Sequence, residues 1–291
     1  MTVERSGGDE LFALLQKALP QHLLSRGMHA LARSRQPVVR NAILRTVLRS
    51  YPQIDMHEAL QPDPFAYESF NAFFTRELRP DARPVATGAR TLVSPVDGTV
   101  SQLGVTNAGQ LLQAKGMHYT CAGLMADTPS AGRYQGGSFA CLYLAPYNYH
   151  RIHMPCDGIL RATRYVPGQL FSVSAATART VPDLFARNER VVCDFDTDDG
   201  PLCMVLVGAL FVGSIETVYA GEINPPPGRK GQVRAIDAGV GRAFKRGEEL
   251  GRFNMGSTVI LLTGHPATFA PRVEPAEPVR LGQLLARFDA R

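Results

Sequence analysis

Residues 201–221, PLCMVLVGALFVGSIETVYAG, are the stretch of sequence that decides the fold. Short apolar runs that are rich in Val, Leu, Ile, Phe and Tyr and interrupted by glycine are typical of buried strands. The longest apolar part, residues 204–215, has 12 residues, whereas a membrane-spanning helix needs about 20. We therefore predict buried β structure here, in a chain that does not cross a membrane.

Five further segments share this composition and are separated by Asp-Gly and other glycine or proline turns. They are residues 91–105, 138–146, 158–168, 190–196 and 256–264. Because no long helical pattern lies between them, they favour an antiparallel β body. Residues 166–188 are less β-like and predict a helical insertion, and the loop NPPPGRKG at residues 224–231 is expected to be exposed.

The N-terminal region differs from this body. Between residues 11 and 50, apolar residues recur at helical spacing beside seven Lys or Arg and no Asp or Glu. Such a region either lies at an anionic membrane surface or packs its apolar stripe on the body. The predicted fold class is α+β, with an amphipathic helical region at residues 1–85 and a predominantly antiparallel β body at residues 86–291.

The junction between the two regions has its own signals. Phe70, Phe73 and Phe74 have the spacing of a short helix that docks an aromatic face. Residues 80–88 are rich in turn formers and predict a linker.

Composition narrows the class of protein. The chain has 291 residues, a net charge of +5 and five cysteines. The odd count and the lack of CxxC spacing favour buried, reduced thiols in a cytosolic protein over disulfides or a zinc ribbon. Acidic residues and glycines precede the first apolar run, which is not typical of a signal peptide. The sequence contains no phosphate-loop, dinucleotide-binding or α/β-hydrolase motif.

Two histidines and an aspartate are candidates for proton transfer. His150 and His153 lie after a predicted strand, where positions three apart point to opposite faces, so no metal site is predicted. They are either a general base and a separate proton donor or structural histidines. Asp97 either caps a turn or orients a histidine. Three Gly-Ser pairs offer a nucleophile, and spacing does not choose among them: Gly137-Ser138, Gly213-Ser214 and Gly256-Ser257.

Seven short segments, in order along the chain, resemble the bacterial-type phosphatidylserine decarboxylase proenzymes. They are FNAFFTR at residues 70–76, SPVDG and SQLG within 94–104, LQAKG at 112–116, YHRIHMP at 149–155, LFARNER at 184–190, VGSIET at 212–217, and GRF followed by MGST within 251–258. Each segment is short, but their conjunction is specific.

The resemblance implies self-cleavage between Gly256 and Ser257 by a triad of Asp97, His153 and Ser257. His153 takes the hydroxyl proton of Ser257, while Asp97 holds the imidazole and stabilises its charged form. The serine oxygen attacks the Gly256 carbonyl, β-elimination breaks the ester, and loss of ammonia leaves a covalent pyruvoyl group at residue 257. The products are a β chain of residues 1–256 and an α chain of residues 257–291.

The same resemblance implies decarboxylation of phosphatidylserine to phosphatidylethanolamine, through a Schiff base between the pyruvoyl cofactor and the lipid's amine. His150 is expected to supply a proton to the carbon that loses carbon dioxide, with a reused His153 as the rival. A lipid substrate favours the interfacial interpretation of residues 11–50 and a peripheral enzyme on the cytoplasmic face of an anionic membrane. Nucleic acid is not an expected partner, and a homo-oligomer is left open.

Two other functions remain open from the sequence. A pyruvoyl-dependent decarboxylase of a soluble amino acid uses the same cleavage chemistry and differs in its product. A non-catalytic membrane-surface binding module predicts one intact chain in which the Gly-Ser and His segments are structural.

Overall fold

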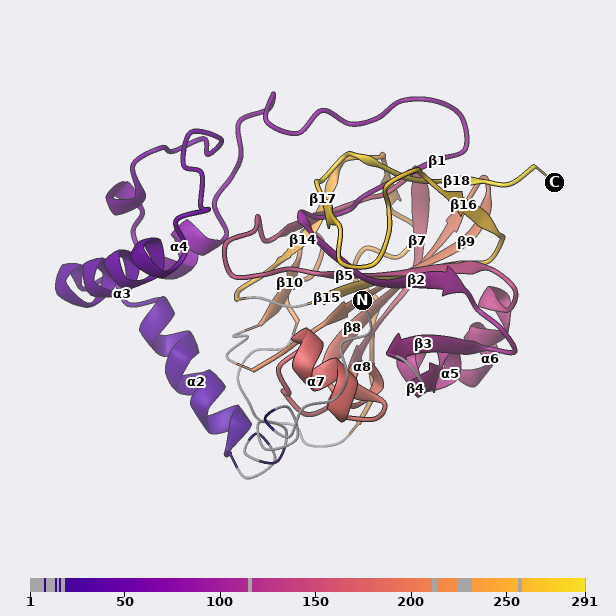
Figure 1. The fold of residues 1–291 in the computed structure, drawn as a ribbon, viewed down its shortest axis with the longest axis horizontal. Helices are drawn as coiled ribbons and strands as arrows, with labels where there is room; N and C mark the ends of the chain where they lie inside the picture. Colours follow the sequence, from indigo (N-terminus) through magenta and orange to yellow (C-terminus); the bar gives the residue numbers. More distant parts are fainter. Residues whose placement is uncertain are drawn as a thin grey trace.

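The computed structural model describes residues 8, 14, 16, 19–114, 117–210, 214–223, 232–255 and 258–290. Its helical elements are α2 (Gln21–Ala32), α3 (Pro37–Ser50), η1 (Pro64–Ala66), α4 (Phe70–Phe74), α5 (Cys121–Met125), α6 (Thr128–Ala131), η2 (Gly132–Tyr134), α7 (Ala175–Thr180) and α8 (Leu184–Arg187). Figure 1 shows α2, α3 and α4 together at one side of a β-rich body, so the predicted α+β class with an N-terminal helical region is confirmed.

The strands follow in chain order. They are β1 (Thr91–Val93), β2 (Gly98–Val105), β3 (Gln110–Ala114), β4 (Met117–Thr120), β5 (Ser138–Tyr143), β6 (Arg151–His153), β7 (Gly158–Val166), β8 (Arg190–Thr197), β9 (Gly200–Val207), β10 (Ile215–Thr217), β11 (Gly221–Glu222), β12 (Arg234–Ile236), β13 (Ala243–Phe244), β14 (Glu249–Phe253), β15 (Thr258–Thr263), β16 (Ala267–Phe269), β17 (Pro278–Val279) and β18 (Leu284–Phe288).

Within the described ranges, the largest sheet has nine strands, in the order β12-β7-β8-β9-β15-β5-β2-β17, with β13 also paired to β7. Its pairings are antiparallel. All six predicted strand segments contribute a strand to this sheet, so the antiparallel body is confirmed.

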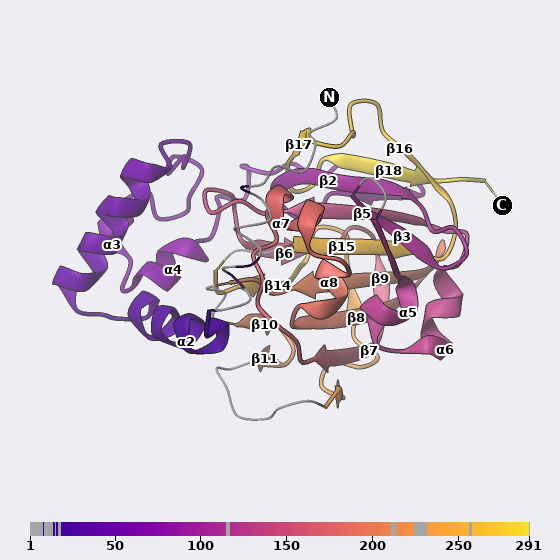
Figure 2. The same cartoon turned by 60° about the horizontal axis from the view of Figure 1, so that its bottom comes forward.

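Strand β9 explains why its sequence is apolar without alternation. Side chains of a strand point alternately to opposite faces, and both faces of β9 are covered. The two sets join different buried clusters: Leu202, Met204 and Leu206 on one face, and Cys203, Val205 and Val207 on the other. The second cluster also takes side chains from α5, α7 and α8, which confirms the predicted helical insertion; α7 and α8 lie over the sheet in Figure 2.

The first cluster is closed by smaller sheets in the orders β1-β18-β16 and β11-β10-β14-β6. The second of these positions the candidate site. Strand β6 carries the histidine segment and pairs with β14, which runs toward Gly256-Ser257. Strand β15 of the large sheet begins directly after that pair. Gly256 and Ser257 themselves lie outside the described residues, as does the predicted loop at 224–231.

Helix α2 packs a polar face on the body and leaves apolar side chains outside. Gln21 and Ser25 are buried, whereas Leu23 is 64% exposed and Leu31 is 44% exposed. The Gln21 side chain accepts a hydrogen bond of 2.8 Å from the backbone of Leu170 in the body. Packing of an apolar stripe on the body, one of the two alternatives from the sequence, therefore does not describe this helix.

Helix α3 instead contributes Leu44 to a third cluster, which contains Phe70, Phe73 and Phe74 of α4 and confirms the predicted aromatic docking. The five cysteines are buried and free, as expected. In the part of the chain that the structure covers, no helix has the length and apolar character of a membrane span.

Candidate active site

Asp97 lies in the turn between β1 and β2 and is held by an arginine from the preceding segment. Arg83 Nε lies 2.9 Å from Asp97 Oδ1, and Arg83 Nη2 lies 2.6 Å from Oδ2. The backbone N–H of Leu281 donates a further hydrogen bond of 2.8 Å to Oδ1. Both oxygens of the carboxylate therefore already accept hydrogen bonds from strong donors.

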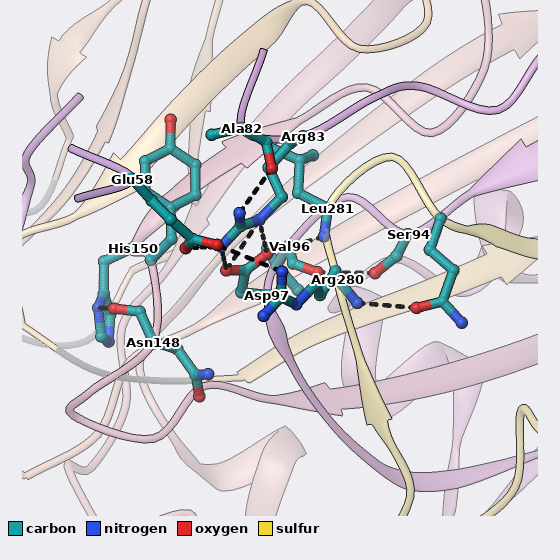
Figure 3. A network of polar contacts seen from close by, with 12 residues as sticks. Glu58, Ala82, Arg83, Ser94, Val96, Asp97, Asn148, His150, Arg280 and Leu281 are labelled. Atoms are coloured by element: carbon teal, nitrogen blue, oxygen red, sulfur yellow. Dashed lines mark hydrogen bonds and ion pairs between the residues drawn. The ribbon is translucent and has the colours of Figure 1, made fainter. Parts of the chain in front are cut away.

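Arg83 is shared between two carboxylates, as Figure 3 shows. Its Nη2 also lies 2.7 Å from Glu58 Oε2, and its side chain is only 8% exposed. Burial acts to lower the pKa of Arg83, but the hydrogen bonds and charges of Asp97 and Glu58 outweigh it and raise that pKa. Residues 80–88 form no helix or strand, as predicted for a linker, yet they deliver this buried cation to the site.

His153 is oriented by two groups that the sequence interpretation did not assign. Its Nδ1 lies 2.8 Å from the carbonyl oxygen of Gly247, and its Nε2 lies 3.1 Å from the hydroxyl of Tyr149. A carbonyl oxygen only accepts, so in the neutral ring Nδ1 carries the proton. Nε2 then keeps its lone pair, accepts from Tyr149 and is the basic nitrogen of the ring.

The protein environment also sets the charge of His153. Burial lowers its pKa, while the hydrogen bond to Gly247 and the charges of Glu249 and Asp97 act in the opposite direction, and the net shift is downward. A lowered pKa keeps the imidazole neutral, and thus able to accept a proton, below the pH at which a free histidine becomes charged.

His150 is fully buried, with its ring 3.9 Å from that of Phe74, measured between centroids. Its Nδ1 lies 2.8 Å from the carbonyl oxygen of Asn148, so Nδ1 carries the proton here too. Burial and the charge of Arg76 lower the pKa of His150 to about 3. Its Nε2 has no hydrogen-bond partner among the described residues. Buried polar atoms are normally satisfied, so this nitrogen has hydrogen-bonding capacity that the described residues do not use.

The residues on either side of Gly256-Ser257 have two unusual features. Met255 has φ of +117°, a region that a bulky side chain rarely adopts and that costs on the order of 1–3 kcal/mol. The Oγ1 atom of Thr258 is buried and has no partner in the portion of the chain described. The segment therefore combines backbone strain on one side of residues 256–257 with unused hydrogen-bonding capacity on the other.

The structure brings Asp97 and His153 into one region but does not join their side chains, and Ser257 lies outside the described residues. The backbone N–H of His153 donates 2.9 Å to the carbonyl of Pro95, two residues before Asp97. Across the described atoms, however, no hydrogen bond links Asp97 to the His153 ring; Asp97 faces Arg83, and Gly247 holds the ring. His150 and His153 have different partners; His150 lies directly before β6, and His153 is the last residue of that strand.

Sequence reasoning missed Arg83, Glu58, Tyr149 and the Gly247 carbonyl. Tyr149 stood inside a quoted segment, four residues before His153, and its spacing to the histidine was the available signal. Gly247 contacts His153 through its backbone carbonyl, so the identity of the residue at position 247 does not indicate this contact.

The Arg83 network predicts a large effect on stability. Arg83→Gln is expected to lower the free energy of unfolding by about 3–5 kcal/mol, because the buried carboxylate of Asp97 loses its cation. Arg280→Gln is the matched control: Arg280 also pairs with Glu58, but its side chain is 68% exposed, and its loss should cost less than about 1 kcal/mol. Urea denaturation in a Ser257→Ala background, where self-cleavage cannot divide the chain, measures both. Equal losses for the two variants would contradict a buried role for Arg83.

Comparison with known proteins identifies the family. The profile of the family described as phosphatidylserine decarboxylase matches residues 70–287, and a second profile, described as PSD, matches residues 11–52.

Curated relatives agree over most of the chain. The chain is 51% identical to the phosphatidylserine decarboxylase proenzyme of Shewanella sp. (strain MR-4) over 286 residues, covering 96% of this chain and 97% of the relative. Identity to the proenzyme of Alkalilimnicola ehrlichii is 50% over 258 residues, covering 88% and 89% of the two chains. Identity to that of Shewanella frigidimarina is 47% over 287 residues, covering 96% and 99%. The chain belongs to the phosphatidylserine decarboxylase family.

Proposed function

We propose that the chain is a proenzyme that cleaves itself between Gly256 and Ser257 and then decarboxylates phosphatidylserine to phosphatidylethanolamine. Membership of the family, over nearly the whole chain, supports the reaction. The observation that carries the proposal in the structure is the pair of neutral histidines, each with a protonated Nδ1 held by a backbone carbonyl and an unprotonated Nε2. Two such bases serve the two proton transfers that maturation and turnover require.

In maturation, His153 is the general base. Its Nε2 takes the hydroxyl proton of Ser257 as the serine oxygen attacks the Gly256 carbonyl and displaces the amide nitrogen. The resulting ester is broken by β-elimination, which releases the carboxylate of Gly256 and leaves a dehydroalanine at 257. Water then replaces the nitrogen of that residue, and ammonia leaves. The strain at Met255 favours attack by raising the energy of the uncut backbone.

In this proposal Asp97 keeps only one of the two tasks that the family resemblance implied. The Gly247 carbonyl already fixes the tautomer of His153, so Asp97 is not needed to orient the ring. Its charge raises the pKa of His153 and so stabilises the imidazolium that forms during attack. Arg83 keeps the carboxylate in place for this electrostatic role.

The pyruvoyl group at residue 257 supplies a carbonyl that binds the substrate amine and takes up the electron pair left by carbon dioxide. The bare Nε2 of His150 and the unpartnered Oγ1 of Thr258 fit a polar group at this place. Replacement of the carboxylate by hydrogen consumes one proton overall, and this proton comes from solvent. His150 takes it up at Nε2 and delivers it to the α-carbon.

Helix α2 supports a peripheral location on the cytoplasmic face of the membrane, with residues 1–85 as the contacting region. Its exposed face carries Leu23 and Leu31 near the basic side chain of Arg26. Apolar side chains that enter the lipid boundary beside a cation suit an anionic bilayer.

Intact mass and product analysis of the wild-type protein test the proposed function. Native expression should give a chain that ends at Gly256 and a second chain that begins at residue 257 and lacks one amine nitrogen. Vesicles of phosphatidylserine should be converted to phosphatidylethanolamine. An uncut chain would contradict the cleavage, and turnover of free serine or another soluble amino acid in place of the lipid would favour a soluble substrate.

A further inference from the structure

A polar pocket of about 310 Å³ lies between the N-terminal helical region and the sheet that leads to the cleavage site. Arginines from both sides line it: Arg33 and Arg35 follow α2, and Arg252 lies on β14. Glu216 and Asn254 complete the wall on the body side. Helix α4 divides the region, since polar residues such as Asn71 face the pocket while its phenylalanines pack in the apolar cluster beside His150.

The three arginines are not equally available to a ligand. Arg33 makes a double contact with Glu222, at 2.9 and 3.2 Å, which ties α2 to β11. Arg252 contacts Glu216 at 2.5 Å through Nη2 alone, and its Nε and Nη1 have no partner among the described residues. Arg35 pairs with Glu68 through Nη2, and its side chain is 75% exposed. Arg252 and Arg35 thus retain guanidinium N–H groups that can turn toward an anion.

The pocket is also close in the chain to residue 257, where the proposed reaction takes place. Asn254 is buried in its wall, and its side chain is held by Asn71 at 3.1 Å and by Ser214 at 2.7 Å. Ser257 lies three positions after Asn254 in the chain, and three residue steps span at most about 10 Å. Met255, between them, packs against the aromatic cluster that contains Phe74. Chain connectivity therefore limits the distance from the pocket wall at Asn254 to residue 257 to about 10 Å.

We infer that Arg252 and Arg35 bind the phosphodiester of the serine phospholipid headgroup, which directs the amine toward residue 257. This assignment rests on the proposed function. The phosphate is a better ligand for the arginines than the carboxylate that reacts. Ion pairing of the carboxylate stabilises the ground state and slows loss of carbon dioxide, whereas the phosphate is unchanged in the reaction and can be held throughout. The Phe74 ring beside His150 offers the reacting carboxylate less solvation than water does, which favours loss of carbon dioxide.

Steady-state kinetics with a short-chain, water-soluble phosphatidylserine test this site without a contribution from vesicle binding. Arg252→Gln is expected to raise KM by about 10- to 100-fold, as for loss of a charge-assisted hydrogen bond, and to leave kcat within about twofold. Arg35→Gln should raise KM less, because Arg35 is more exposed. Arg161→Gln is the control, since Arg161 is 55% exposed on β7, and its KM should equal that of the wild type. Mass analysis should find complete chain cleavage in each variant.

Competition identifies the part of the headgroup that is bound. Glycerophosphoserine and inorganic phosphate should both inhibit the wild type competitively, and both should inhibit Arg252→Gln at least about tenfold more weakly. Unchanged KM in both Arg252→Gln and Arg35→Gln would overturn the assignment, and so would a fall in kcat alone. If Arg252→Gln does not fold, the KM of Arg35→Gln tests the assignment, because Arg35 is exposed and its substitution should not disturb folding. A wild-type enzyme that fails to decarboxylate phosphatidylserine refutes the proposed function instead, so the two failures are distinguishable.

Discussion

His153→Ala is expected to leave the protein as one uncut chain of 291 residues with no decarboxylase activity. In the folded protein the Nδ1 proton of His153 is held by the Gly247 carbonyl, so Nε2 is the basic nitrogen. Without that base the Ser257 hydroxyl keeps its proton. A neutral alcohol attacks an amide carbonyl very slowly, so the chain should stay uncut. Intact mass after native expression, and again after prolonged incubation, measures the effect.

The control for this variant is His265→Ala, which removes an exposed histidine on the turn after β15 and should mature normally. Tyr149→Phe tests whether His153 acts as a base or depends on being oriented by Tyr149. It removes the 3.1 Å contact of the Tyr149 hydroxyl with His153 Nε2 but leaves the imidazole of His153. This variant should still cleave. Complete maturation of His153→Ala would refute the base assignment, whatever the behaviour of Tyr149→Phe.

The central sheet could be predicted from sequence because its signal is local. Strand β9 is apolar at every position from Leu202 to Val207 since both of its faces are covered, and such a run is distinctive in the sequence alone. The aromatic spacing of α4 is equally local. The orientation of α2 is not: Gln21 and Ser25 are buried because the body offers hydrogen-bond partners at that place. A hydrophobic pattern does not contain that information.

The sequence predicts the site residues that lie within short motifs. It does not predict those that join the site through contacts between distant parts of the chain. The quoted segments placed Asp97, His150 and His153 among the candidates. Arg83 was assigned to a linker because its buried role arises only when Glu58 and Asp97 meet across the fold. The acceptor for the His153 ring is a backbone carbonyl 94 residues away, which a pattern of side chains cannot reveal.

His150→Gln should mature normally but lose about 10²- to 10⁴-fold in kcat, the usual contribution of a positioned general acid or base. Glutamine keeps a donor for the Asn148 carbonyl and a similar volume against Phe74, so packing is preserved while proton transfer is lost. His57→Gln, at an exposed position, is the control and should retain full activity. Single-turnover assays on fully cleaved protein measure the chemical step directly.

Acid sensitivity gives a second, independent readout for His150. Its pKa is about 3 in the folded protein and about 6.5 in an unfolded chain. The unfolded state therefore binds more protons between these values, and the stability that neutral His150 provides above about pH 6.5 is lost as the pH falls toward 3. The urea concentration at the unfolding midpoint of the wild type should be lower at pH 5 than at pH 7. The same change of pH should lower the midpoint of His150→Gln by less.

The two readouts together separate a catalytic role from a structural one. A purely structural histidine would change the pH dependence of unfolding but leave kcat of the cleaved enzyme near that of the wild type. A proton carrier must change both. The burial that lowers the pKa of His150 leaves Nε2 unprotonated at neutral pH, so it can give the α-carbon only a proton that it has taken up from solvent during the turnover. Loss of chain cleavage in His150→Gln would contradict this division of labour between His150 and His153.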